Sequence, residues 1–239
     1  MTILFAIQGG VATITLNRPE SRNALNLAMC EELLAAAQSA AADASIKLVL
    51  VRGSGPVFCA GADLKERQGM SEAQVRERRM KAFAAYSALE ALPMPAIAVV
   101  AGPVVGSGCE IACACDFIVA TPAASFRVPE AIRGTVGATQ RLPRILGKRL
   151  AKDLLFTGRT LTAGEAERHG LVSRLVAPGK LDALLADLAK SIVEAPGHSL
   201  RLAKRCVDRG VELDPKGALE TEIAAIEEQL AGGGWMGKQ

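Results

Sequence analysis

A glycine-rich turn between an apolar strand and a short helix constrains this chain more than any other stretch. The apolar run at residues 97–101 leads into Gly106-Ser107-Gly108, and a second apolar segment follows at residues 111–115. This order predicts a turn at a helix N-terminus, where free backbone N–H groups and the positive end of the helix dipole point outward. Glycines let a ligand approach the main chain closely, so such a turn can bind an oxyanion.

Glu110 lies just inside the predicted helix, where it is a candidate general acid or base beside those N–H donors. A simpler interpretation stays open, in which Gly106 and Gly108 only form a tight packing turn and Glu110 only suits the helix dipole. Short glycine motifs are frequent, so the turn alone favours this simpler interpretation. Residues 58–65 repeat the pattern, because there too an apolar run is broken by a glycine turn that exposes backbone N–H groups.

The chain of 239 residues is long enough for one domain with a sizeable core, or for one domain with an added helical part. Its net charge is only +3, and no basic block is interleaved with aromatic residues, so we expect no nucleic-acid partner. The uncharged stretch between Glu90 and Glu110 has the length of a membrane span. Prolines and glycines interrupt it, so we expect a loop, a buried strand and a turn, and no membrane association.

Six cysteines and two histidines form no recognisable metal-binding motif. The N-terminus lacks a basic leader and a cleavage site, so we expect a cytoplasmic protein with reduced thiols. Cys109, Cys113 and Cys115 do not have the spacing of a zinc-ligand set, and we expect them to be small buried packing residues. His169 and His198 stand outside any motif, which argues against a histidine-based triad or metal centre.

Strand-like and helix-like segments alternate along the chain. We predict strands at residues 10–16, 47–52, 97–101 and 116–120, and helices at residues 26–42, 71–92, 139–156, 162–169, 180–194, 199–209 and 215–230. Ser71 and Gln74 have the spacing of a capping box, and Asp63 is placed to cap a helix. Repeated strand, strand, helix units indicate an α/β spiral with a C-terminal helical subregion. We divide the chain into a core at residues 1–189 and a helical oligomerisation or lid region at residues 190–239.

Several short motifs occur in one order along the chain. They are Phe58–Lys65, Gly106–Glu110, Cys115–Asp116, Pro129–Glu130 and Thr139–Arg144. In this order they resemble the crotonase (enoyl-CoA hydratase/isomerase) family, and the resemblance extends from about residue 10 to about residue 215. It implies a crotonase-like spiral of ββα units, a homotrimer or a pair of trimers, and an acyl-CoA thioester as substrate. Coenzyme A is then part of the substrate, and no separate cofactor is implied.

The resemblance assigns catalytic roles to four positions. The backbone N–H groups of Ala62 and Ser107 would form an oxyanion hole. Ser107 stands where the family most often has glycine, which leaves the backbone donor intact. Glu110 and Glu130 match the two carboxylates of the hydratases, whereas isomerases commonly keep only the second.

The resemblance also places coenzyme A. Ala60, Ala62 and Leu64 would surround its adenine, Lys65 would lie near its phosphates, and Gly106 would contact the substrate. A mobile lysine suits phosphate as a point charge. Without the resemblance, a solvated lysine at a helix start is the preferred interpretation of Lys65.

These residue types fit the hydration of a C2=C3 double bond conjugated to a thioester. Attack by water puts negative charge on the carbonyl oxygen, which two preorganised backbone N–H groups stabilise. We expect Glu110 to activate the water that attacks C3, because a helix N-terminus favours its ionised form, and Glu130 to protonate C2. The two can share these roles, since coupled carboxylates titrate as a pair. The leading hypothesis is therefore an enoyl-CoA hydratase, a lyase of fatty acid metabolism.

Three features depart from the family pattern. The loop at residues 134–140 is a few residues shorter than usual, which puts the position of Glu130 in question. Arg127 replaces a small residue near Glu130, and an inward-pointing guanidinium would favour the ionised form of that carboxylate. The chain end at residues 232–239 lacks the usual tail that closes over the acyl pocket.

Other functions remain compatible with the sequence. An enoyl-CoA isomerase would use Glu130 alone to move a proton between C2 and C4. Hydration of methylglutaconyl-CoA is suggested by residues 62–67 and Met70-Ser71, which resemble that subgroup. Some relatives of the subgroup bind RNA, so a catalytically weak binding protein for coenzyme A or RNA is the alternative from another class. The lack of a basic, aromatic-rich surface argues against it.

Overall fold

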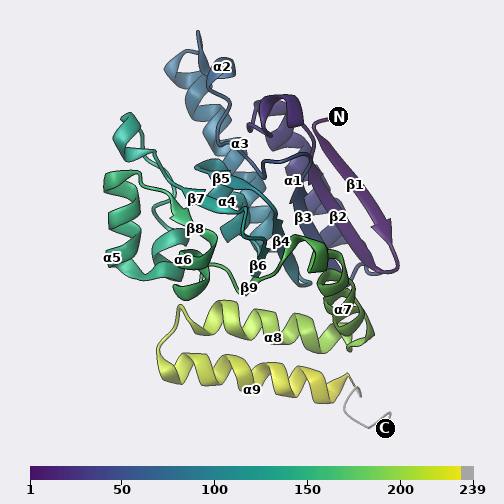
Figure 1. Cartoon of the computed structure of the whole chain (residues 1–239). Helices are drawn as coiled ribbons and strands as arrows, with labels where there is room; N and C mark the ends of the chain where they lie inside the picture. Colours follow the sequence, from purple (N-terminus) through teal and green to yellow (C-terminus); the bar gives the residue numbers. More distant parts are fainter. Residues whose placement is uncertain (233–239) are drawn as a thin grey trace.

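Figure 1 shows the fold of a computed structural model, which describes residues 1–232. A six-stranded sheet runs through the body in the order β1-β2-β3-β4-β6-β9. Its strands are β1 (Ile3–Gln8), β2 (Val11–Leu16), β3 (Leu48–Gly53), β4 (Ala96–Val100), β6 (Phe117–Ala120) and β9 (Arg174–Leu175). β1 pairs antiparallel with β2, and each later pair in this order is parallel. A smaller sheet has the order β5-β7-β8, formed by β5 (Pro103–Val105), β7 (Ser125–Arg127) and β8 (Leu161–Thr162).

Helices alternate with these strands and then continue alone at the end of the described chain. They are α1 (Leu27–Ala42), α2 (Leu64–Arg67), α3 (Glu72–Glu90), α4 (Ser107–Cys113), α5 (Arg141–Thr157), α6 (Ala163–Arg168), α7 (Leu181–Glu194), α8 (Gly197–Gly210) and α9 (Pro215–Ala231), with short 3₁₀ helices η1 (Pro19–Ser21), η2 (Ala131–Arg133) and η3 (Pro178–Lys180). The predicted α/β class with C-terminal helices is confirmed. Within residues 1–232, no helix combines the length and apolarity that crossing a bilayer requires.

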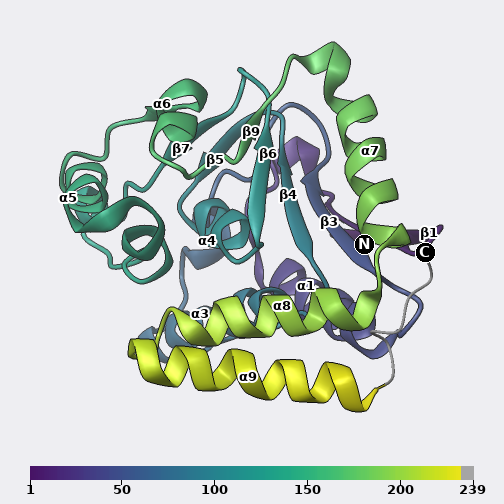
Figure 2. The same ribbon diagram turned by 90° about the horizontal axis from the view of Figure 1, so that it is seen from below.

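β4 lies in the middle of the core, and its side chains alternate between two hydrophobic clusters. Ile97 and Val99 pack with residues of α7 such as Leu185, on one face of the sheet. The two alanines of the strand and Val100 belong to the cluster on the other face. Figure 2 shows α7 and α4 on opposite sides of the strands. Because both faces are covered, β4 is apolar at every position.

Local signals in the sequence set most helix starts correctly. Asn26 caps α1 by accepting the N–H of Met29, and Ser71 forms the predicted capping box with Gln74 at α3. Asp63 caps the first turn of α2, as expected. The prediction omitted β1 and the short strands β5, β7, β8 and β9, and it started the helix of α4 later than the structure does.

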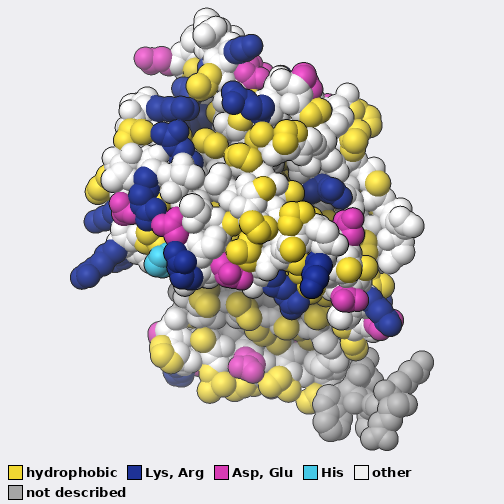
Figure 3. Space-filling model, in the orientation of Figure 1, with side chains coloured by type: hydrophobic (Ala, Val, Ile, Leu, Met, Phe, Trp, Pro, Cys, Tyr) yellow, Lys and Arg dark blue, Asp and Glu magenta, His cyan; other side chains and the backbone are white. Residues whose placement is uncertain are grey.

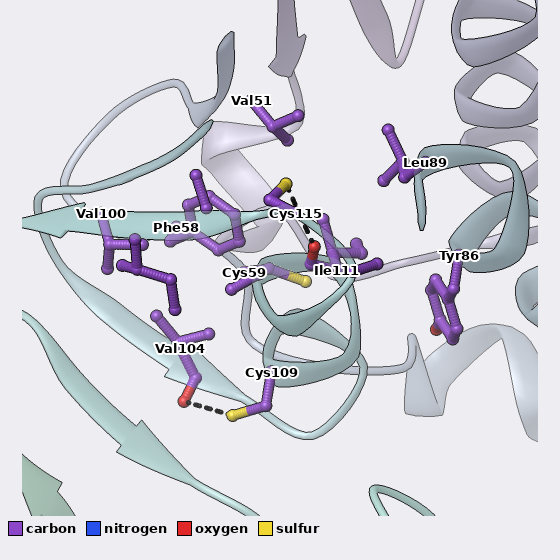
Figure 4. Packing of buried hydrophobic residues seen from close by; sticks show 14 of the residues in the cluster. Val51, Phe58, Cys59, Tyr86, Leu89, Val100, Val104, Cys109, Ile111 and Cys115 are labelled. Carbon is purple, nitrogen blue, oxygen red and sulfur yellow. Dashed lines mark hydrogen bonds between the residues drawn. The ribbon is translucent and has the colours of Figure 1, made fainter. Parts of the chain in front are cut away.

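Buried cysteines pack around α4 and support the turn before it. The Cys109 thiol donates to the carbonyl oxygen of Val104 at 3.5 Å (Figure 4). Gly108 leaves no room for a side chain, because a Cβ there would lie 2.7 Å from the carbonyl oxygen of Cys59. Burial raises the pKa of the Cys59 thiol to about 12 and also raises the pKa of Cys109. All six cysteines are free thiols. Cys109 and Cys115 are buried as predicted, whereas Cys113, also predicted to be buried, is only half-buried.

α8 and α9 form a helical hairpin beside the body, with α8 between the body and α9 (Figures 1 and 2). Lys204 of α8 pairs with Asp116, and Arg144 of α5 pairs with Glu212 in the hairpin turn at 3.1 Å. Large apolar side chains remain exposed along the hairpin, at Val207, Val211, Leu219, Ile223, Ile226 and Leu230. The division predicted between residues 189 and 190 falls inside α7, so the limits of the two units stay a prediction.

Candidate active site

The turn before α4 is a helix N-terminus, as the sequence predicts. Gly106 precedes the first helical residue, Ser107, with φ 52° and ψ −110°, a conformation that residues with a side chain rarely adopt. Gly61 packs against β5, because a Cβ at Gly61 would lie 3.1 Å from the carbonyl oxygen of Val105. β5 thereby connects two turns, and Ala62 and Ser107 border the same cavity.

This cavity, of about 370 Å³, gathers most of the residues that the sequence singles out. It is lined by Ala60, Ala62, Leu64, Gly106, Ser107, Glu110 and Glu130, among others. Lys65 is exposed at the start of α2 and lies outside the lining. A second cavity, of about 1100 Å³, shares Glu110, Gly137 and Ala138 with the first. Phe83 and its neighbours on α3 form one wall of both cavities.

Glu110 is held from two sides. Its Oε1 accepts the backbone N–H of Ala138 at 2.8 Å, and its Oε2 accepts Nη1 of Arg141 at 2.9 Å. The Glu110 side chain is only 10% exposed, and the Arg141 side chain is only 16% exposed. Arg141 also pairs with Glu90 at the end of α3. Glu110 therefore borders the cavity with a positive charge directly beside it.

Glu130 faces two glycines that leave room for its carboxyl group. A Cβ at Gly106 would lie 2.4 Å from Oε1 of Glu130, and a Cβ at Gly137 would lie 2.9 Å from its Cγ. Its Oε2 is buried, and no group among residues 1–232 donates a hydrogen bond to it. Burial raises the pKa of Glu130 above its ordinary value of 4.5, and the negative charge of Glu110 adds to the rise, although two nearby arginines oppose it. The surroundings thus favour a protonated Glu130.

The sequence raised two doubts about Glu130, namely a nearby Arg127 guanidinium and a shortened loop that could displace it. Arg127 does not point inward, because its Nε donates to the carbonyl oxygen of Gly158 at 2.6 Å. The shortened loop at residues 134–140 leaves Glu130 in the cavity, and Ala138 adopts φ 54° there while its N–H donates to Glu110. The expected loss of the closing tail concerns a chain end whose last seven residues, 233–239, lie outside the described residues.

Sequence reasoning does not identify Tyr86 or the role of Arg141. Tyr86 is buried in α3 and lines the cavity together with Ser107. Burial raises the pKa of the Tyr86 phenol, so this group stays neutral. A hydroxyl within the apolar face of a predicted helix was the available signal for Tyr86. The sequence holds no local signal for the role of Arg141, because its partners Glu90 and Glu110 are far away along the chain.

Positive charge surrounds the approach to α2 and α3. Figure 3 shows Lys and Arg side chains gathered over these two helices, and Arg67 and Arg79 line both cavities. A ligand that carries phosphate groups would meet this charge. In the described part of the chain, no three His, Cys, Asp or Glu side chains are grouped as metal ligands would be.

Comparisons with known proteins find one family along nearly the whole chain. The family model described as "Enoyl-CoA hydratase/isomerase" matches residues 6–231. A protein of Rhizobium meliloti named "Probable enoyl-CoA hydratase" is 39% identical over 240 residues, which cover 97% of this chain and 93% of that protein. The crystal structure of an enoyl-CoA hydratase from Bacillus anthracis has a TM-score of 0.90 and 36% identity, and the match covers 95% of this chain and 90% of that one. The crystal structure of an enoyl-CoA hydratase from Mycobacterium smegmatis has a TM-score of 0.92 and 33% identity. That match covers 96% of this chain and 91% of the other.

Proposed function

This chain belongs to the enoyl-CoA hydratase/isomerase family, and we propose that it is an enoyl-CoA hydratase. It adds water across the C2=C3 double bond of a 2-enoyl-CoA and forms a 3-hydroxyacyl-CoA. The observation that carries the proposal is the contrast between two carboxyl groups on one cavity: Glu110 is paired with Arg141, whereas burial raises the pKa of Glu130. Hydration needs a base and an acid, and two environments that differ in this way supply them.

The thioester carbonyl is proposed to bind at the turn before α4. There the backbone N–H groups of Ala62 and Ser107 donate to its oxygen, and Ser107 adds the positive end of the α4 dipole. Water attacks C3 as ionised Glu110 takes one of its protons, while protonated Glu130 delivers a proton to C2. A proton then passes from Glu110 to Glu130, which restores both groups for the next turnover.

The rest of the substrate is proposed to occupy the two adjoining cavities. Coenzyme A would pass Ala60, Ala62 and Leu64 with its phosphates toward Lys65, and the acyl group would extend along α3 into the larger cavity. The positive charge over α2 and α3 suits the phosphates. Coenzyme A arrives as part of the substrate, and the proposal requires no separate cofactor.

Loss of the enone absorbance of crotonyl-CoA tests this function. We expect the wild-type protein to remove the absorbance and to yield a product heavier by one water molecule in mass spectrometry. A wild-type protein that leaves crotonyl-CoA and longer or branched 2-enoyl-CoAs unchanged would contradict the proposal.

An enoyl-CoA isomerase is the second candidate, and the hydrogen bonds of Glu110 favour it. Both oxygens of Glu110 already accept a hydrogen bond, which leaves each oxygen one lone pair for water. Isomerisation does not require Glu110 to bind a water molecule, because Glu130 alone would move a proton between C4 and C2. A 3-enoyl-CoA substrate separates the candidates, since an isomerase converts it to the conjugated 2-enoyl-CoA and the enone absorbance appears.

Gly106 provides a test of how Glu130 is placed. We expect Gly106→Ala to lower the hydration rate by about 10²-fold, because the new Cβ would displace the Glu130 carboxyl group. The variant should also lose about 1–3 kcal/mol of unfolding free energy, since Gly106 has a positive φ. Steady-state kinetics and denaturant unfolding measure the two effects.

Gly170→Ala is the matched control, because Gly170 also has a positive φ, of 78°, but nothing lies within 4 Å of the added Cβ. It should lose stability and keep its activity. Equal activity losses in the two variants would show that backbone strain, and not the position of Glu130, limits the reaction.

The assembly and the location of the protein stay proposals as well. A homotrimer or a pair of trimers is supported by the exposed apolar side chains of the α8–α9 hairpin, such as Val207 and Ile226, which a second copy of the chain would cover. We also propose a cytoplasmic location.

A further inference from the structure

The guanidinium of Arg141 joins two carboxylates from different helices. Its Nε and Nη2 donate to the two oxygens of Glu90 at 3.1 and 2.6 Å, and its Nη1 donates to Oε2 of Glu110 at 2.9 Å. Each of the three guanidinium nitrogens therefore has a carboxylate acceptor. Binding two carboxylates in this way needs the planar guanidinium group with its fixed N–H directions, which the ammonium group of lysine lacks.

The hydrogen bonds of Arg141 connect three helices that are separate in the sequence. Arg141 is the first residue of α5, Glu90 is the last residue of α3, and Glu110 belongs to α4. Three helices that are separate in the sequence thus meet at one guanidinium. The Glu90 side chain is 53% exposed and that of Glu110 is 10% exposed, so the chain of contacts runs from the surface into the cavity.

We propose that Arg141 is a positioning residue that orients Glu110 for activation of the attacking water, with Glu90 fixing the guanidinium. This proposal rests on the proposed hydratase function. The N–H of Ala138 holds Oε1 of Glu110, but it carries no full charge. Arg141 alone supplies both a second fixed point for the carboxylate and a compensating positive charge.

The groups that face Glu110 include one positive charge. They are Arg141 from α5, Glu90 and Tyr86 from α3, Glu130 before η2, and Cys113 on α4 itself. Tyr86 and Cys113 stay neutral, because burial raises the pKa of both, that of Cys113 to about 12. Arg141 is therefore the positive charge in this set, and the other charged members are acids. Without it, the carboxylate of Glu110 keeps only the N–H of Ala138 as a hydrogen-bond donor among residues 1–232.

Arg141→Gln and Arg141→Lys test the proposal by steady-state kinetics. We expect kcat of R141Q to fall by about 10²-fold with little change in KM. R141K should recover only part of kcat, because it retains the charge but lacks the fork. In R141A, added guanidinium at a non-denaturing concentration should restore part of kcat.

Arg159 provides a matched control outside both cavities. It also bridges two carboxylates, with Nε 2.6 Å from Oδ2 of Asp153 and Nη1 3.3 Å from Oε1 of Glu165. R159Q and R159K should keep the wild-type kcat, and guanidinium should not stimulate R159A. Circular dichroism and thermal unfolding of all variants separate a folding defect from a loss at the site.

Two results would overturn the inference. One is an R141Q protein that is folded and has the wild-type kcat. The other is a loss of kcat that R141K shares in full and that guanidinium does not relieve in R141A. Inactivity of the wild-type protein on every 2-enoyl-CoA would instead contradict the proposed function, so the two failures are distinguishable.

Discussion

Replacing Glu130 with glutamine is expected to lower kcat for crotonyl-CoA hydration by a factor of about 10²–10⁴, because the proton donor to C2 is lost. The amide fills the same space between Gly106 and Gly137, so substrate binding and KM should change little. Stopped-flow or steady-state loss of the enone absorbance measures the effect. Near-normal kcat in the variant would show that another group protonates C2.

The same substitution should stabilise the protein above neutral pH. Burial raises the folded-state pKa of Glu130 above its ordinary value of 4.5, so its protonated form favours folding. This contribution is fully present below the unfolded pKa and is lost as pH rises through the folded pKa. Glutamine cannot ionise, and E130Q should therefore melt at a higher temperature than the wild type at high pH, with the difference shrinking toward pH 4.5. A constant difference across pH would contradict this account.

Replacing Glu110 with glutamine is expected to separate hydration from isomerisation. The amide lacks the basicity to take a proton from water, so kcat for hydration should fall by a factor of about 10²–10⁴. Any conversion of a 3-enoyl-CoA to the 2-enoyl-CoA should persist in E110Q, because that reaction needs only Glu130. The two substrates can be followed in one absorbance assay, as enone loss and enone gain.

Glu220→Gln is a suitable control for this variant. Glu220 lies on α9, and its one ion pair in the described structure is the long contact with Lys216, at 3.8 Å. E220Q should hydrate crotonyl-CoA at the wild-type rate. If E110Q loses neither reaction, the water is activated without Glu110, and the proposed division of roles is wrong.

The parts of the fold that depend on neighbouring residues were predictable. The capping box of Ser71 and Gln74, the cap at Asp63 and the glycine turn before α4 each depend on residues a few positions apart. The apolar run of β4 also has a local explanation, since a strand covered on both faces needs no polar alternation. β1 lacks such a signal, because most of its residues are exposed or half-buried. β5, β7, β8 and β9 are too short to show a period.

The candidate site also has a part that the sequence predicts and a part that it does not. Ordered motifs brought Ala62, Ser107, Glu110 and Glu130 to attention, and the structure places all four on one cavity. Their surroundings were not predictable, because they come from contacts across the fold. The link from Glu90 through Arg141 to Glu110 joins three helices, and the direction of the Arg127 side chain is decided by a carbonyl oxygen at the end of α5.

The cysteines packed around α4 make the rigidity of the site measurable without any substrate. A thiol reacts as its thiolate, and burial raises the pKa of Cys59 to about 12, so a reagent in solution reaches this sulfur only when the native structure opens. Cys59 and Cys109 pack directly beneath the turn that carries Ser107. The rate at which an alkylating reagent labels them therefore reports how often the backbone around Gly106 and Ser107 opens in the folded protein.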